Sequence, residues 1–190
     1  MQRLYPKIIF KRKMNMTTKL KSLTLAICLL SINAFAQTGA KEYTAGHIFY
    51  VTLPDYMKKT GGLNTAATIQ FKNTVKDVYG FIIEDNKEEL GLVDMSYASI
   101  DEFYEDFIKD FASDEEKRKV TKPQSLKKGE TNFVECDVTY YDKEAKSDIY
   151  YFIGIAETKA AYYKVLCWAT VANKDKYKAD FQKILYSIRD

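Results

Sequence analysis

A chain of 190 residues can hold one domain, or with difficulty two. Seven of its 29 basic residues lie in positions 1–36, which contain no Asp or Glu, so the rest of the chain has 22 basic against 26 acidic residues and a net charge near −4. This acidic balance argues against nucleic acids and anionic membranes as partners, although the formal charge of +3 on the whole chain would suggest them.

The first 36 residues have the composition of an export signal. The basic residues precede an apolar run over 22–30, which is too short to span about 30 Å of hydrocarbon, since that takes roughly 20 residues. The run is followed by Ala34-Phe35-Ala36, with small residues at the two positions that a signal peptidase recognises. We expect cleavage between Ala36 and Gln37, export by the general secretion route to the periplasm or beyond, and no transmembrane segment in the mature chain.

Two details of the leader refine this prediction. Its basic region is long, so Met14 or Met16 is an alternative translation start. Lipid attachment at Cys28 is not expected, because Ile27 precedes it and the apolar run continues beyond it.

The first part of the mature chain predicts three strands. Residues 47–53 are rich in β-branched and aromatic side chains and stop before Pro54, which cannot donate a ladder hydrogen bond. Two more strands, over 66–71 and 75–84, are separated by the turn-like Lys72-Asn73-Thr74 and are expected to form a hairpin.

Two amphipathic helices are expected. Ser99-Ile100-Asp101-Glu102 is a capping box. In this motif the serine hydroxyl oxygen accepts a hydrogen bond from the backbone amide of the glutamate, and the glutamate carboxylate accepts one from the backbone amide of the serine. Apolar residues then recur at three- and four-residue spacing up to Phe111, and the same periodicity marks residues 174–188. We expect both helices to seal the apolar side of one sheet.

Between the helices the sequence predicts a meander of strands over 132–141, 148–156 and 161–172. Their connections are too short for parallel neighbours, so these strands are expected to be antiparallel. The expected fold class is therefore α+β, in which an antiparallel sheet of about six strands packs against two amphipathic helices in a single domain over 37–190.

Only Cys136 and Cys167 remain after cleavage, on the first and third strands of the meander. Two strand spacings place them about 9.6 Å apart. Disulfides rarely tolerate Cα separations above about 7 Å, so we expect two free, largely buried thiols.

This order of elements resembles the fold of PsbP, an extrinsic photosystem subunit, and its relatives, which include small exported bacterial proteins and Ran-binding import factors. The segments that carry the resemblance are Val51-Thr-Leu-Pro-Asp55, Ser99-Ile-Asp-Glu-Phe-Tyr104 and Phe181-Gln-Lys-Ile-Leu-Tyr-Ser-Ile188. The resemblance extends from about His47 to the end of the chain. It implies a fold and an export route, and it does not imply a photosynthetic or nuclear-import role, because function does not follow from fold.

The sequence offers little for catalysis or cofactor binding. His47 is the only histidine, no Gly-x-Ser-x-Gly motif exists, and both mature cysteines lie in apolar strands, where a thiol usually packs as a small hydrophobe. The acidic runs lack the regular spacing and central glycine of a calcium loop, and Gly61-Gly62 lacks the Lys-Ser/Thr of a phosphate loop. We expect no catalytic residue, metal ligand or cofactor.

Tyrosine pairs at 140–141, 150–151 and 162–163 occur on three consecutive predicted strands. Neighbouring residues of a strand face opposite sides, so one tyrosine of each pair is expected to point outward and could contribute to an interaction surface. The alternative is ordinary strand composition and packing between sheet and helix. The residues predicted for this surface are Tyr141, Tyr150, Tyr162 and Trp168.

Three functional classes stay open. A non-catalytic binding or accessory module with an unknown protein or small-molecule partner is favoured, as a monomer or weak oligomer. An enzyme or metal-dependent protein would have to use acidic residues and His47. A structural envelope component is the third, and no sequence feature separates it from the first.

Overall fold

The computed structural model describes residues 39–46 and 48–190. The predicted leader, its cleavage site between Ala36 and Gln37, and His47 lie outside these ranges, and what the sequence predicts for them stays a prediction. Among the described residues, no helix has both the length and the apolar character needed to cross a bilayer.

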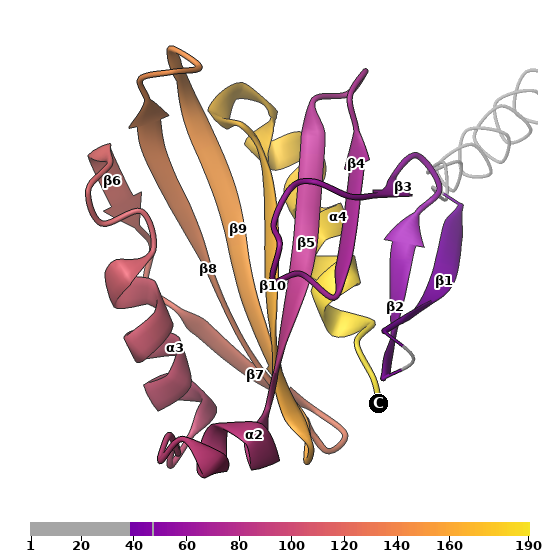
Figure 1. Cartoon of the computed structure of the whole chain (residues 1–190). Helices are drawn as coiled ribbons and strands as arrows, with labels where there is room; N and C mark the ends of the chain where they lie inside the picture. Colours follow the sequence, from indigo (N-terminus) through magenta and orange to yellow (C-terminus); the bar gives the residue numbers. More distant parts are fainter. Residues whose placement is uncertain (1–38, 47) are drawn as a thin grey trace, which may run out of the picture. The chain divides into compact units, whose positions relative to one another are not determined.

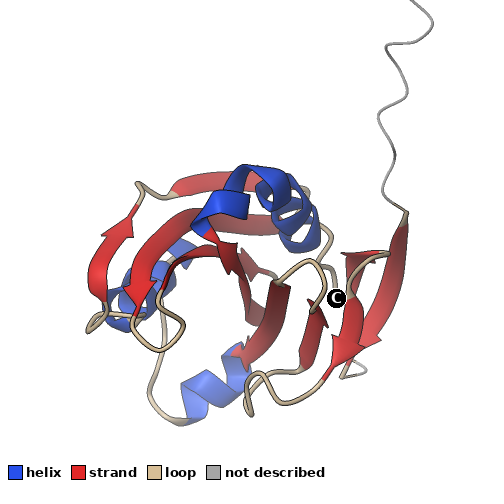
Figure 2. Ribbon diagram, turned by 90° about the horizontal axis from the view of Figure 1, so that it is seen from above, coloured by secondary structure: helices blue, strands red, loops and turns tan. Residues whose placement is uncertain are grey.

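An antiparallel sheet of eight strands forms the centre of the fold (Figure 1). It is strongly curved when viewed along its strands (Figure 2). The meander, formed by β8 (Thr131–Asp142), β9 (Ser147–Glu157) and β10 (Ala161–Thr170), is antiparallel, as predicted. Across the sheet the order is β3 (Lys58–Thr60), β4 (Ile69–Asn73), β5 (Val78–Asn86), β10 (Ala161–Thr170), β9 (Ser147–Glu157), β8 (Thr131–Asp142) and β6 (Glu116–Val120), with β7 (Gln124–Lys128) also paired to β8.

The first predicted strand lies outside this sheet. β2 (Phe49–Pro54) pairs with β1 (Ala40–Ala45) in a separate two-stranded sheet. Its inward-facing residues, among them Val51 and Leu53, are buried in the same core as α4 (Lys174–Tyr186). This hairpin therefore contributes to the core without extending the main sheet.

The two predicted helices are confirmed, with small differences at their ends. α3 (Ile100–Asp110) begins after Ser99, whose side chain accepts a hydrogen bond from the amide of Glu102 at 3.2 Å. The Glu102 carboxylate accepts from the amide of Ala98 at 2.6 Å rather than from that of Ser99, so only half of the predicted capping box forms. α4 is preceded by a short 3-10 turn, η2 (Val171–Asn173).

The helices cover opposite faces of the sheet, and the expectation that both seal one side is wrong. Tyr162 and Leu166 of β10 pack in the core beneath α3, whereas Tyr163 and Val165 pack in the core beneath α4. Figure 1 shows α4 behind β5 and β10. Neighbouring residues of a strand face opposite sides, and in β10 both neighbours, such as Tyr162 and Tyr163, are buried aromatic or apolar residues. The sheet therefore has two apolar faces, and each face needs a helix to cover it.

Four strands were not predicted, which brings the total among the described residues to ten rather than about six. These strands, β1, β3, β6 and β7, are short and mostly exposed, so they lack the apolar alternation that marks a strand in sequence. The helix α2 (Lys87–Leu92), which contains no buried residue, was missed for the same reason.

Cys136 and Cys167 are both free and buried, which confirms the prediction for these two residues. Cys136 on β8 lies in the core beneath α3, and Cys167 on β10 lies in the core beneath α4. They are therefore separated by β9 and by the sheet itself.

Candidate functional site

Four aromatic rings form a continuous row across four neighbouring strands: Tyr79, Trp168, Tyr151 and Tyr140, from β5, β10, β9 and β8. Successive ring centroids are 5.2, 5.3 and 5.9 Å apart, and the corresponding interplanar angles are 17°, 21° and 16°. The four side chains, here called the aromatic row, are only partly buried.

Strand register creates this row. Trp168 lies directly opposite Tyr79 on one side and Tyr151 on the other, so the three rings project from the same face. Tyr140, which pairs with Ile149, takes the diagonal position beside Tyr151.

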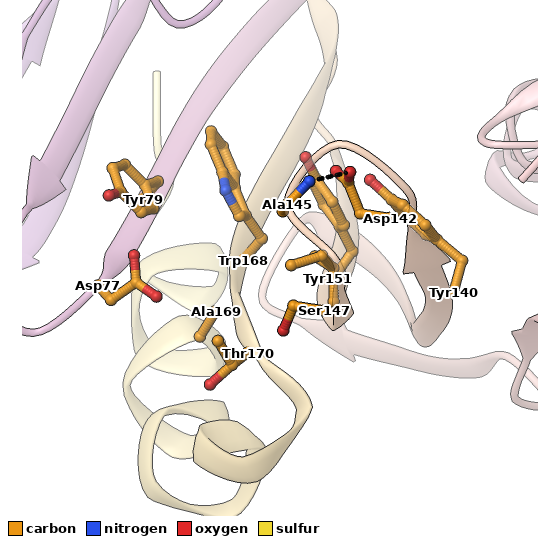
Figure 3. A pocket seen from close by; sticks show the side chains of 11 residues that line it. Asp77, Tyr79, Tyr140, Asp142, Ala145, Ser147, Tyr151, Trp168, Ala169 and Thr170 are labelled. Carbon is orange, nitrogen blue, oxygen red and sulfur yellow. Dashed lines mark hydrogen bonds between the residues drawn. The ribbon is translucent and has the colours of Figure 1, made fainter.

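The end of α3 leaves this part of the sheet open. The last aromatic side chain beside that helix, Phe111, touches Tyr151 edge-on with centroids 5.2 Å apart. Next to the aromatic row, toward the strand ends, lies a pocket of about 340 Å³. Its lining also includes Asp77, Thr170, Ile149 and Asp142. We call it the aromatic pocket (Figure 3).

Carboxylates occupy two sides of the aromatic pocket. Asp142 accepts hydrogen bonds from the amides of Glu144 and Ala145, each at 2.8 Å, which fixes the turn between β8 and β9. Asp77 lies in the turn before β5 with a left-handed φ of 53°, a conformation that aspartate tolerates better than most residues. In Figure 3 the two side chains lie on opposite sides of Trp168 and Tyr151.

The surroundings keep the tyrosine hydroxyls of the aromatic row protonated. Burial raises the pKa of Tyr79, and a hydrogen bond to Asp77 raises it further. Burial likewise raises the pKa of Tyr151 and of Tyr140, with a further increase from the nearby charges of Asp142 and Glu115. The hydroxyls are therefore available as donors and acceptors at neutral pH.

The structure does not bring the four predicted surface residues together. Trp168 lines the aromatic pocket. Tyr141 lies on the opposite face of the sheet from Trp168, with the Lys117 ammonium 4.8 Å from its ring centroid. Tyr150 is fully buried and donates a hydrogen bond to Asp137 at 2.9 Å.

Tyr162 is also in a core, because its ring stacks on that of Phe103 with centroids 4.1 Å apart. Tyr150 and Tyr162 are therefore buried and do not point outward, whereas Tyr141 is partly exposed on the opposite face. The tyrosines that accompany Trp168 are Tyr140 and Tyr151. The register of the folded sheet decides this, because it places Tyr151 of β9 directly opposite Trp168.

Two buried carboxylates lie on the other face, between β8 and α4. Asp137 contacts the ammonium groups of Lys174 and Lys178 at 2.8 and 2.7 Å. Glu135 accepts from Gln182 at 2.7 Å and from Tyr186 at 2.5 Å.

These two carboxylates have protein partners and attach α4 to the sheet, so they do not form an open reactive site. Within the described ranges, no three His, Cys, Asp or Glu side chains cluster closely enough to hold a metal ion.

Similar solved structures identify the fold. No protein-family model and no curated protein sequence matches this chain. The solution structure of cyanobacterial PsbP from Synechocystis sp. PCC 6803 is similar with a TM-score of 0.56 and 11% identity, over 84% of this chain and 96% of that one. The fold is PsbP-like. The crystal structure of LpqN, involved in cell envelope biogenesis of Mycobacterium tuberculosis, is similar with a TM-score of 0.52 and 7% identity, over 83% of this chain and 88% of the other.

The aromatic pocket of this PsbP-like domain rests on the meander and β5, so the resemblance explains the scaffold on which the pocket is built. At such low sequence identity the resemblance does not indicate a ligand, so the chemistry of the pocket is argued from its own side chains.

Proposed function

We propose that the mature chain is an exported, non-catalytic binding module that takes a small molecule in the aromatic pocket. The observation that carries the proposal is that four aromatic rings are left partly open beyond Phe111, at the end of α3. Tyrosine and tryptophan offer a large apolar body with a polar tip, which is the composition favoured at binding surfaces.

The size and rigidity of the pocket support a small molecule. Its volume of about 340 Å³ falls in the range of small-molecule sites, about 300–1,000 Å³. The rings are held by strand pairing on both sides and by contact with one another, so little ordering is needed when a ligand binds.

Export is part of the same proposal and rests on the leader. The basic segment, the short apolar run and the small residues before Gln37 support delivery to the periplasm or the cell exterior. A binding module there would meet its ligand outside the cytoplasm.

The test compares small molecules retained by the purified exported protein. We expect mass spectrometry of the denatured protein to find a compound with the wild type and with Tyr141→Ala, and to find much less of it with Trp168→Ala. Tyr141 is the matched control because it is a partly exposed tyrosine on the opposite face. If Trp168→Ala retained the same compounds in the same amounts, the aromatic pocket would not be the binding site.

A further inference from the structure

The charge distribution in the aromatic pocket points to a class of ligand. Its lining includes two carboxylates, Asp77 and Asp142, and no lysine or arginine. A bound anion would meet both carboxylates without a compensating cation, and like charges at close range are strongly disfavoured.

The carboxylates stand at the two ends of the pocket and not at its centre. Asp77 precedes β5 and Asp142 ends β8, with β10 and β9 between them. Followed along the curved sheet, three strand spacings of about 4.8 Å place the two backbones about 14 Å apart. The negative charge therefore lies at two separate points.

Aromatic side chains separate the two carboxylates. The rings of Trp168 and Tyr151 lie between Asp77 and Asp142 (Figure 3), and Ile149 also lines the pocket. Because the rings stack on one another, they present edges rather than faces to the pocket. Ring edges carry a partial positive charge, so they favour contact with methylene groups over contact with an ammonium group.

We propose that the aromatic pocket binds an elongated aliphatic amine, with an ammonium group at each end and methylene groups between. The ammonium groups would donate to Asp77 and Asp142, and the methylene chain would cross Ile149 and the aromatic row. This inference rests on the proposed function, since it names the ligand class of the same pocket.

The single tryptophan makes the inference directly measurable. Trp168 is the only tryptophan of the chain and lines the pocket, so its fluorescence reports ligand binding without a label. We expect titration of the full exported chain with spermidine to give a saturable change in fluorescence. Putrescine, a shorter diamine, should bind more weakly because it cannot reach both carboxylates.

Charge-removing variants test the two ends of the pocket. Asp77→Asn and Asp142→Asn should each weaken spermidine binding about tenfold or more, because each removes one charge-assisted contact. Asp142→Asn keeps an oxygen for the amides of Glu144 and Ala145, so the turn should survive. Glu130→Gln serves as the matched control, since Glu130 is an exposed acidic residue in the turn before β8, outside the pocket lining.

Neutral probes separate this inference from the proposed function. Octane-1,8-diol, which has similar length and no charge, should not bind. A saturable response to octanediol or cellobiose and none to spermidine would overturn the amine inference and leave the binding pocket in place. Equal spermidine affinity for wild type, Asp77→Asn and Asp142→Asn would also overturn it, whereas only the retention experiment with Trp168→Ala decides the proposed function.

Discussion

At the scale of single residues, Asp137 is a buried carboxylate whose partners lie on β9 and on α4. It is 4% exposed, and its carboxylate contacts Lys174, Lys178 and the hydroxyl of Tyr150. Burial alone would raise the pKa of Asp137, but the hydrogen bonds from these three partners outweigh it and hold the pKa below its ordinary value. The ionised carboxylate therefore stabilises the folded state.

Asp137→Asn should lower the free energy of unfolding by about 2 kcal/mol at pH 7, because two lysines lose a buried ionic partner. Urea unfolding measures this value. Asp175→Asn on the same helix is the control, since Asp175 is exposed and its replacement should change stability by less than about 0.5 kcal/mol. Equal losses for the two variants would contradict the assigned role of Asp137.

The same carboxylate predicts a pH dependence. Because its pKa is lower in the folded than in the unfolded state, its contribution is complete above the unfolded value of about 3.9 and is lost as the pH falls through the lower folded value. The stability difference between wild type and Asp137→Asn should therefore be constant from pH 7 to about pH 5 and decrease at more acidic pH. Urea unfolding at a series of pH values measures this difference. A difference that increased as the pH fell would contradict the prediction.

Residue patterns also show how far the candidate site could be predicted. The sequence indicated that one tyrosine of each pair faces outward and that Trp168 belongs with them. It could not say which member, because both faces of this sheet are apolar and alternation alone gives no direction. The sequence places Asp142 next to the tyrosine pair at 140–141, but it gives no sign that Asp77 belongs with them, because an acidic residue in a turn is ordinary. Only the three-dimensional register places both carboxylates beside the aromatic row.

At the scale of elements, the long, strongly periodic segments were predictable and the edges were not. α3, α4 and the strands of the meander bury apolar residues at regular spacing, so local sequence determines their type. β6 and β7 exist because β8 offers a free edge, and their own residues are almost entirely exposed. Their formation depends on a distant partner, which a local pattern does not record.

The packing of α4 depends on a glycine in β9. A methyl group on Gly154 would lie 2.6 Å from Cδ2 of Leu185, which is fully buried. Gly154→Ala should therefore cost about 1–3 kcal/mol of unfolding free energy, because the core must shift to accept it. Urea unfolding measures this cost, and Gly61→Ala, where no atom lies within 4 Å of the added methyl, should stay within about 0.5 kcal/mol of wild type.

At the scale of the whole molecule, the predicted cleavage would change the charge of the protein. The full chain carries a formal charge of +3, and removal of positions 1–36 would leave it near −4. We expect intact-mass analysis of protein recovered from the exported fraction to give a chain that starts at Gln37. A mass that includes the leader would contradict the predicted cleavage, and with it the acidic character on which the exclusion of nucleic acids rests.

The mature domain should remain reduced even in an oxidising compartment, because its only two thiols lie in the two different cores. A bridge would have to pass β9 and cross the sheet. Burial also raises the pKa of Cys136 to about 11 and raises that of Cys167 further, so neither is a thiolate at neutral pH. We expect iodoacetamide to label both cysteines of the mature protein in urea and neither in the folded state, and a reductant to leave the unfolding midpoint unchanged. A native mass that matched the oxidised form would contradict this arrangement of β8, β9 and β10. A disulfide requires the two sulfurs to meet, and in the described fold they lie on opposite faces of the sheet with β9 between them.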